Sequence, residues 1–206
     1  MSISKQKVWW AAAGLLWAVG VCVGMRTMLD YENTPGTPGR PLAEWPSGSQ
    51  VPRTKGVPAI VVIAHPQCPC TRATIGELAL LMTRLRDRVT ATVVFAKPKG
   101  SADGWEETDL WRAALAIPGV RVIRDEGMVE TDRFHASASG QTMLYSASGV
   151  LLFSGGITAS RGHSGDNAGR SAIVSLVTTG RAERSRTSVY GCALHDAASE
   201  EQRKSL

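Results

Sequence analysis

Short runs of apolar residues divide this chain into segments that have the length of β-strands. The run from Ile60 to Ala64 is continuously apolar, which suits a strand buried on both faces of a sheet. Two later runs are joined by a four-residue loop that ends in glycine, as in a β-hairpin. The pattern predicts five strands, over residues 60–64, 89–96, 120–123, 141–145 and 150–154.

Some segments between and after these strands have the apolar spacing of helices. Ile75, Leu78, Met82 and Leu85 recur at spacings of three and four, so they predict an amphipathic helix that ends near Arg88 and turns this face to the core. Two further helices are expected, over residues 105–117 and from a cap at Asp166 or Asn167 to Gly180. The order β-α-β-α-β followed by a hairpin and a helix predicts an α/β fold, a sheet flanked by helices.

The N-terminal region differs in character from the rest. Val8 to Met25 is an uncharged apolar run of 18 residues, which is long enough to cross a bilayer of about 30 Å hydrocarbon thickness. Lys5 and Lys7 precede the run, and positive residues are retained on the cytoplasmic side. We therefore expect a single-pass anchor with the N-terminus in the cytoplasm and the rest of the chain outside it. A cleaved signal peptide is the alternative, although its apolar core is usually shorter.

Residues 26–57 are rich in proline and glycine and show no apolar period. Proline favours an extended chain, so this segment is expected to be a linker that holds the folded domain away from the membrane. The predicted organisation is a cytoplasmic head at 1–7, an anchor at 8–25, the linker, a domain at 58–180, and a polar tail at 181–206.

The composition allows one well-buried domain and gives little support to nucleic-acid binding. The chain has 206 residues, of which 43% are hydrophobic, and a formal net charge of +5. The positive residues are spread along the chain without an aromatic-basic stripe, so nucleic acid is not an expected partner.

Cys68 and Cys70 are the predicted site of the chemistry, because they lie where the first strand passes into a helix. Unpaired backbone N–H groups and the positive end of the helix dipole favour a thiolate there. Arg72 and His65 are expected to add to this field. Two cysteines flanking one proline in an exported domain indicate redox or metal chemistry.

Five segments support a resemblance to a known family: His65–Arg72, Gly140–Tyr145, Ser154–Thr158, Arg161–Asn167 and Tyr190–Cys192. Over about residues 58–180 the chain resembles the membrane-anchored thioredoxin-like proteins called RedB. The resemblance implies a thioredoxin-like fold and an extracytoplasmic thiol–disulfide role that acts on protein thiols or disulfides, without a cofactor.

Two features depart from ordinary thioredoxins. The cysteines are separated by one residue instead of two, so a disulfide between them would close a small, strained and oxidising ring. Aligning the strand at 141–145 with the strand that follows the cis-proline of thioredoxin-like proteins puts Gly140 in the position of that proline. Glycine leaves the backbone approachable but does not fix a cis bond.

Three functions remain open from the sequence. The first is thiol–disulfide exchange by Cys68 and Cys70. The second is delivery of copper or zinc, with Cys68, Cys70, His65 and Cys192 as ligands. The third is a thioredoxin-fold binding module without chemistry. Cys192 lies in the only apolar patch of the tail and is expected either to meet the motif as a resolving thiol or third ligand, or to be buried far from it.

Overall fold

A computed structural model of the chain describes residues 5–37 and 39–195. Its centre is a five-stranded sheet in the order β3-β2-β1-β4-β5. β1 pairs with β2 and β2 with β3 in parallel, whereas β4 pairs antiparallel with both β1 and β5. All five predicted strands are therefore confirmed. Their bounds are β1 Ala59–Ala64, β2 Thr90–Lys97, β3 Val120–Glu126, β4 Gln141–Tyr145 and β5 Leu151–Gly155.

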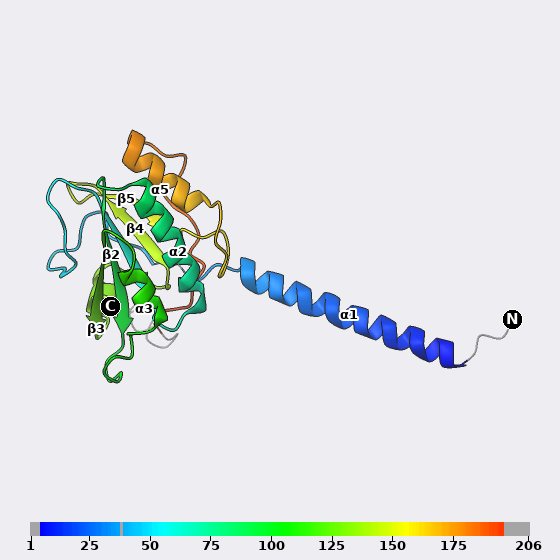
Figure 1. The fold of residues 1–206 in the computed structure, drawn as a ribbon. Coiled ribbons are helices and arrows are strands. Elements are labelled where there is room, and N and C mark those ends of the chain that lie inside the picture. The colour runs from blue at the N-terminus through cyan, green and yellow to red at the C-terminus, as the bar shows by residue number, and fades with distance from the viewer. Residues whose placement is uncertain (1–4, 38, 196–206) are drawn as a thin grey trace.

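Three helices cover one face of this sheet, as Figure 1 shows. They are α2 Pro69–Arg84, α3 Asp109–Leu115 and α5 Ala168–Thr179. Because side chains alternate along a strand, Ile60 and Val62 of β1 point to this face and pack with the helices. The apolar face predicted for the first of these helices is confirmed, and its members Ile75, Leu78, Met82 and Leu85 are all buried.

The opposite face of the sheet is covered by irregular chain and one short helix. Val61 and Ile63 of β1 point to this side and pack with Val51, Phe134 and Leu194. Trp45 makes edge-to-face contacts with Phe134 at 5.2 Å between ring centroids. The short helix is α4, Val129–Arg133. This face is thus built by segments from before, within and after the predicted domain at 58–180.

Two predicted helix bounds are wrong, and one helix was not predicted. α2 ends at Arg84 instead of near Arg88. α3 begins at Asp109 instead of at 105, because the preceding loop buries Glu106 completely against Lys97 of β2 and Arg124 of β3. α4 has only five residues, too few for a periodic pattern to be visible.

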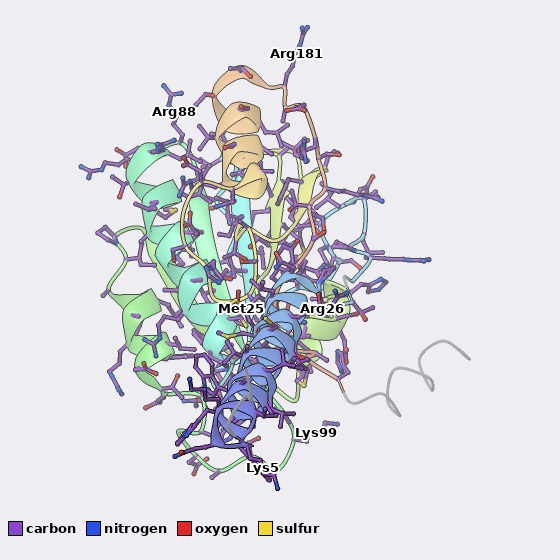
Figure 2. The ribbon with its side chains drawn as sticks, turned by 90° about the vertical axis from the view of Figure 1, so that its right-hand side faces the viewer. Lys5, Met25, Arg26, Arg88, Lys99 and Arg181 are labelled. Atoms are coloured by element: carbon purple, nitrogen blue, oxygen red, sulfur yellow. The ribbon has the colours of Figure 1, made fainter. Side chains whose placement is uncertain are left out.

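The first helix, α1, runs from Lys5 to Asn33 and has no buried residue. It projects from the domain as a straight rod, with Lys5 at its far end and Met25 and Arg26 nearer the domain (Figures 1 and 2). By length and composition it can cross a membrane, as a signal sequence near an N-terminus also can. The helix continues beyond Met25 through the first eight residues of the expected linker.

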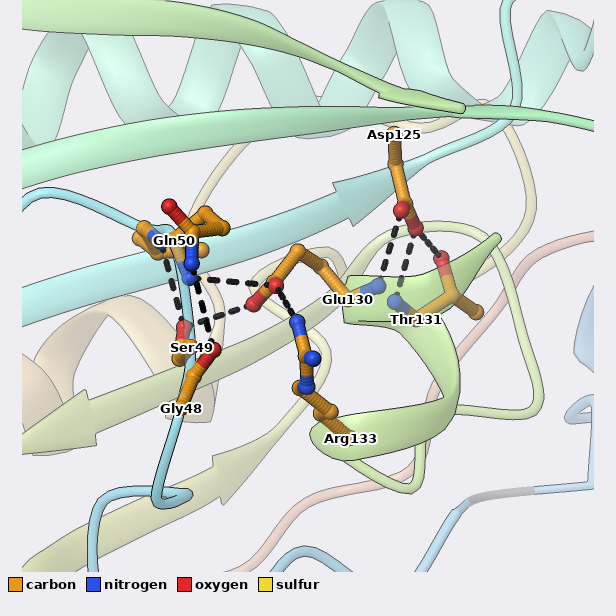
Figure 3. A network of polar contacts seen from close by, with 8 residues as sticks. Gly48, Ser49, Gln50, Asp125, Glu130, Thr131 and Arg133 are labelled. Carbon is orange, nitrogen blue, oxygen red and sulfur yellow. Dashed lines mark hydrogen bonds and ion pairs between the residues drawn. The ribbon is translucent and has the colours of Figure 1, made fainter. Parts of the chain in front are cut away.

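The rest of the proline-rich segment lies along the domain and differs from the extended spacer that its composition favours. The N–H of Trp45 donates to the carbonyl of Gly149 at 2.8 Å. Glu130 of α4 accepts hydrogen bonds from the Ser49 hydroxyl at 2.6 Å and from the Gln50 N–H at 3.1 Å. Figure 3 shows this network, in which Asp125 holds the start of α4. Hydrogen bonds to backbone carbonyls and to a carboxylate of the domain hold the segment against the domain, although its prolines favour an extended spacer.

Candidate functional site

The site begins where β1 ends and α2 starts. β1 is buried along its whole length, and the N–H of Cys68 then donates to the carbonyl of His65 at 3.2 Å in the connecting turn. Proline at position 69 suits the first turn of a helix, where its missing N–H is not needed. Cys68 is the N-cap of α2, and no side chain caps the helix there. Its thiol therefore lies at the positive end of the helix dipole.

The structure brings Cys192 from the tail to this thiol. The Sγ atoms of Cys68 and Cys192 lie 2.8 Å apart, although the two residues are 124 positions apart in the sequence. Both cysteines are free in the structure. The alternative in which Cys192 is buried far from the motif is therefore wrong. The tail comes here because the Ser139 N–H donates to the Cys192 carbonyl at 2.8 Å.

A chain of hydrogen bonds reaches Cys68 from the other side. The His65 N–H donates to the Ser139 hydroxyl at 2.8 Å, and the hydroxyls of Ser139 and Thr71 lie 2.7 Å apart. Thr71 in turn donates to the Cys68 sulfur. Each hydroxyl can accept one bond and donate the next, so the chain ends in a donor directed at the thiolate.

The three thiols differ in acidity. Burial opposes the thiolate of Cys68, but hydrogen bonds from Cys192 and Thr71 outweigh it and hold the pKa of Cys68 below its ordinary value. Burial and the neighbouring Cys68 thiolate raise the pKa of Cys192 to about 12. Burial and the same neighbour raise the pKa of Cys70. Of the three thiols, that of Cys68 therefore loses its proton most readily.

Arg161 is the cation of the site and was not predicted as a site residue. It lowers the pKa values of both Cys70 and Cys192, against the stronger opposing effect of burial. Its guanidinium donates to the Gly191 carbonyl at 2.9 Å and to the Thr34 carbonyl at 3.0 Å. Arg161 therefore connects the tail beside Cys192 with the end of α1.

Two residues expected to strengthen the field at the cysteines do not do so. Burial lowers the pKa of His65, and its Nδ1 accepts a hydrogen bond from the Gln67 N–H at 3.2 Å, so the ring is neutral at physiological pH. Arg72 is exposed and pairs with Asp109 of α3. In residues 5–37 and 39–195, no cluster of three or more histidine, cysteine, aspartate or glutamate side chains is placed to hold a metal ion.

Gly140 closes the site beside α2. Its N–H donates to the Ile63 carbonyl at 2.8 Å, and its φ of +85° is one that L side chains rarely adopt. A Cβ added there would lie 2.9 Å from Oγ1 of Thr74. The described residues contain no cis peptide bond, so the loop turns toward the cysteines through a left-handed glycine.

Sequence reasoning missed Arg161, Ser139 and Thr71 as contributors to the site. Arg161 stands in a segment that supports the family resemblance, and Ser139 directly precedes the glycine aligned with the cis-proline. Thr71 follows the motif directly. Their positions in or beside these motifs were the only hints in the sequence, because the contacts that they make join distant parts of the chain.

No known family model matches the chain, and no curated protein matches it. Among solved structures, an uncharacterized conserved protein from Geobacillus kaustophilus is similar over 80% of this chain and 93% of its own, with a TM-score of 0.56 and 15% identity. A hypothetical protein from Sinorhizobium meliloti is similar over 78% and 93%, with a TM-score of 0.56 and 17% identity. A secreted disulfide oxidoreductase of Mycobacterium tuberculosis is similar over 60% and 81%, with a TM-score of 0.43 and 16% identity.

The fold is thioredoxin-like. Its mixed sheet has a β-α-β unit at the centre, a terminal hairpin and a final helix. The predicted fold class is confirmed, and the cysteine motif lies at the start of the helix that follows the central strand. At these identities the two structures with TM-scores of 0.56 show the fold alone, so the chemistry has to be argued from the site.

The acidity of Cys68 gives a first testable prediction. Thr71→Val removes the hydroxyl donor, and hydrogen bonds to charged groups contribute about 1.5–3 kcal/mol. We expect the thiolate fraction of Cys68, at a pH below its midpoint, to fall by roughly tenfold or more. A pH titration of labelled cysteine by carbon NMR measures this change. Thr71→Ser keeps the hydroxyl and is the control; equal titration of the two variants would contradict the assigned hydrogen bond.

Proposed function

We propose that this chain is a membrane-tethered thiol–disulfide redox protein whose chemistry is centred on Cys68. The observation that carries the proposal is the position of the Cys68 thiol, at the N-terminus of α2 and 2.8 Å from the thiol of Cys192. A thiolate at a helix N-terminus is both a good nucleophile and a good leaving group in disulfide exchange. A second thiol in contact with it supplies the other half of a two-electron couple.

We assign the redox couple to Cys68 and Cys192, with Cys70 as a third thiol beside them. The sequence alone favours a bond between Cys68 and Cys70, which would close a strained ring across one residue. The contact between Cys68 and Cys192 joins two separate segments and needs no such ring. Cys70 is buried in the first turn of α2 and interacts with the Cys68 thiolate, so it can exchange into the couple as a resolving thiol.

The membrane and compartment assignments are part of the same proposal. The apolar run at 8–25 within α1 serves as an uncleaved anchor, and Lys5 and Lys7 keep residues 1–7 in the cytoplasm. The domain then lies outside the cytoplasm, where disulfides persist; if the cell is a Gram-negative bacterium, this compartment is the periplasm. Reporter fusions after residue 60 test this orientation. A fusion that is active only with a cytoplasmic reporter would overturn the orientation and the compartment.

The partners are protein thiols or disulfides, and the resemblance to RedB points to the same role. The domain at 58–180 supplies Cys68 and Cys70, and the tail at 181–206 supplies Cys192. Exchange of this kind needs no cofactor, because sulfur atoms carry both electrons.

The test is a redox titration of the full chain in detergent, combined with an insulin-reduction assay and metal analysis of the same sample. A reversible two-electron couple together with exchange activity supports the proposal. A potential above roughly −200 mV would indicate an oxidant and one near −270 mV a reductant. Stoichiometric copper or zinc without exchange activity would replace the proposal by metal delivery. If the protein had neither bound metal nor exchange activity, the remaining function would be a binding module without chemistry.

A further inference from the structure

The thiols of the site differ in their access to solvent. Cys68 is only 1% exposed and Cys70 only 5% exposed. Cys192 is half-buried and lies over Cys68, with exposed Ala193 beside it. A sulfur must be reachable in line with the S–S bond to be attacked. A partner that approaches from solvent therefore meets Cys192 before it meets Cys68.

The tail is held over Cys68 by the backbone edge of residues 137–139. Ala193 forms an antiparallel bridge with Ala138, the Cys192 carbonyl accepts from the Ser139 N–H, and the Leu194 N–H donates to the Ser137 carbonyl at 2.9 Å. An extended peptide that docks by strand addition needs free N–H and C=O groups of this kind. The chain's own tail already uses them.

Side-chain contacts fix the tail on both sides of Cys192. Val189 is 1% exposed and Leu194 is 8% exposed, so each anchors the tail in a core. Between them, Gly191 packs so closely that an added Cβ would lie 1.8 Å from the Ser139 carbonyl oxygen, and its own carbonyl accepts from Arg161. A foreign peptide could reach Cys68 only after these contacts were broken.

We propose that Cys192 is the sulfur to which a partner bonds, and that Cys68 never bonds to a partner directly. The inference rests on the proposed function and assigns roles within its couple. A partner thiolate attacks Sγ of Cys192 in the Cys68–Cys192 disulfide, forming a partner–Cys192 bond and releasing Cys68 as a thiolate. A second thiol of the partner then attacks its own bonded sulfur, and the thiolate of Cys192 leaves and takes a proton. The partner dithiol loses two electrons and becomes a disulfide, while Cys68 and Cys192 gain them.

The acidities agree with this direction of attack. Exchange is faster when the departing thiol has the lower pKa. Attack on Cys192 releases Cys68 at the N-terminus of α2, where the helix dipole favours a thiolate. Attack on Cys68 would instead release Cys192, whose pKa is raised by burial. Shielding and leaving-group ability thus select the same sulfur.

Glutathione serves as a probe of which sulfur is attacked. The full chain carrying Cys22→Ala and Cys70→Ser keeps only Cys68 and Cys192 and is first oxidised in detergent. Glutathione is then added, the reaction is stopped with acid at early times, and the adducts are located by peptide mass spectrometry. We expect glutathione on Cys192 in at least tenfold excess over Cys68.

A variant of the tail tests the shielding separately. Leu194→Ala removes an apolar anchor without touching either sulfur, so the share of adduct on Cys68 should rise several-fold. An early adduct mainly on Cys68, or a distribution unchanged by Leu194→Ala, would overturn the inference. So would a wild-type chain that oxidises to a Cys68–Cys70 bond and still exchanges, although the proposed redox function would then stand. Loss of all exchange with glutathione and insulin in the wild type would overturn both.

Discussion

Replacing Cys68 with serine is expected to slow insulin reduction by roughly a hundredfold or more, because a hydroxyl is a far weaker nucleophile and leaving group than a thiolate. Cys192→Ser should have a similar effect, since it removes the other half of the couple. Cys70→Ser should keep activity within about tenfold, because the Cys70 thiol is the least involved in the contact between Cys68 and Cys192. The three variants form a matched series that changes one sulfur at a time.

The folded state should survive all three substitutions. Serine has nearly the shape of cysteine, and the thiols are free in the structure, so the reduced form loses no cross-link. Thermal unfolding followed by circular dichroism verifies this for each variant. If Cys70→Ser loses as much activity as Cys68→Ser while remaining folded, the couple is the one favoured by the sequence, Cys68 with Cys70, and the assignment to Cys192 fails.

Arg170→Met is expected to destabilise the domain by about 3–5 kcal/mol, because it leaves a buried carboxylate without its cation. Glu77 of α2 is fully buried and pairs with Arg170 of α5. It also accepts hydrogen bonds from the Gly165 N–H at 2.8 Å and from the Asn167 side chain at 3.1 Å. The pair thus joins the cysteine helix to the final helix and to the loop that carries Arg161.

Thermal denaturation of the full chain measures this effect as a fall in Tm of roughly 10 °C. Asp166→Asn is the matched control, because Asp166 contacts the same arginine at 2.9 Å but is fully exposed. An exposed pair contributes at most about 1 kcal/mol, so the control should change Tm little. Equal losses in the two variants would contradict the assignment of the stability to the buried pair.

The sequence predicts the sheet well because its signals are local. Apolar runs in β1 and β2 identify strands without any knowledge of their partners. Asn167, one of the two predicted caps, caps α5, and its side chain accepts from the Arg170 N–H at 2.7 Å. The same local reading places Cys68 correctly at the start of a helix. The local pattern gave the wrong start for α3, because the loop that buries Glu106 delays the helix until Asp109.

The rest of the site depends on backbone pairing, which carries no residue-type signature. The residues around Cys192 do not indicate that its carbonyl accepts from the Ser139 N–H. That bond nevertheless helps to bring the sulfurs of Cys68 and Cys192 together. The same holds for Arg161, whose partners are mainly carbonyl groups. The proline-rich segment shows the converse: its composition favours an extended spacer, and its hydrogen bonds to the domain prevail.

Because α1 contacts Arg161 of the domain, the proposed anchor would hold the domain rigidly and not as a flexible tether. The Arg161 N–H donates to the Glu32 carbonyl at 3.0 Å, and the guanidinium lies over the Tyr31 ring at 5.0 Å. Asn33, the last residue of α1, is eight helical positions beyond Met25, which is about 12 Å at 1.5 Å per residue. In a bilayer, the thiols would work at a fixed low height above the lipid, so partners whose cysteines travel in or on the membrane would find them by a search in two dimensions.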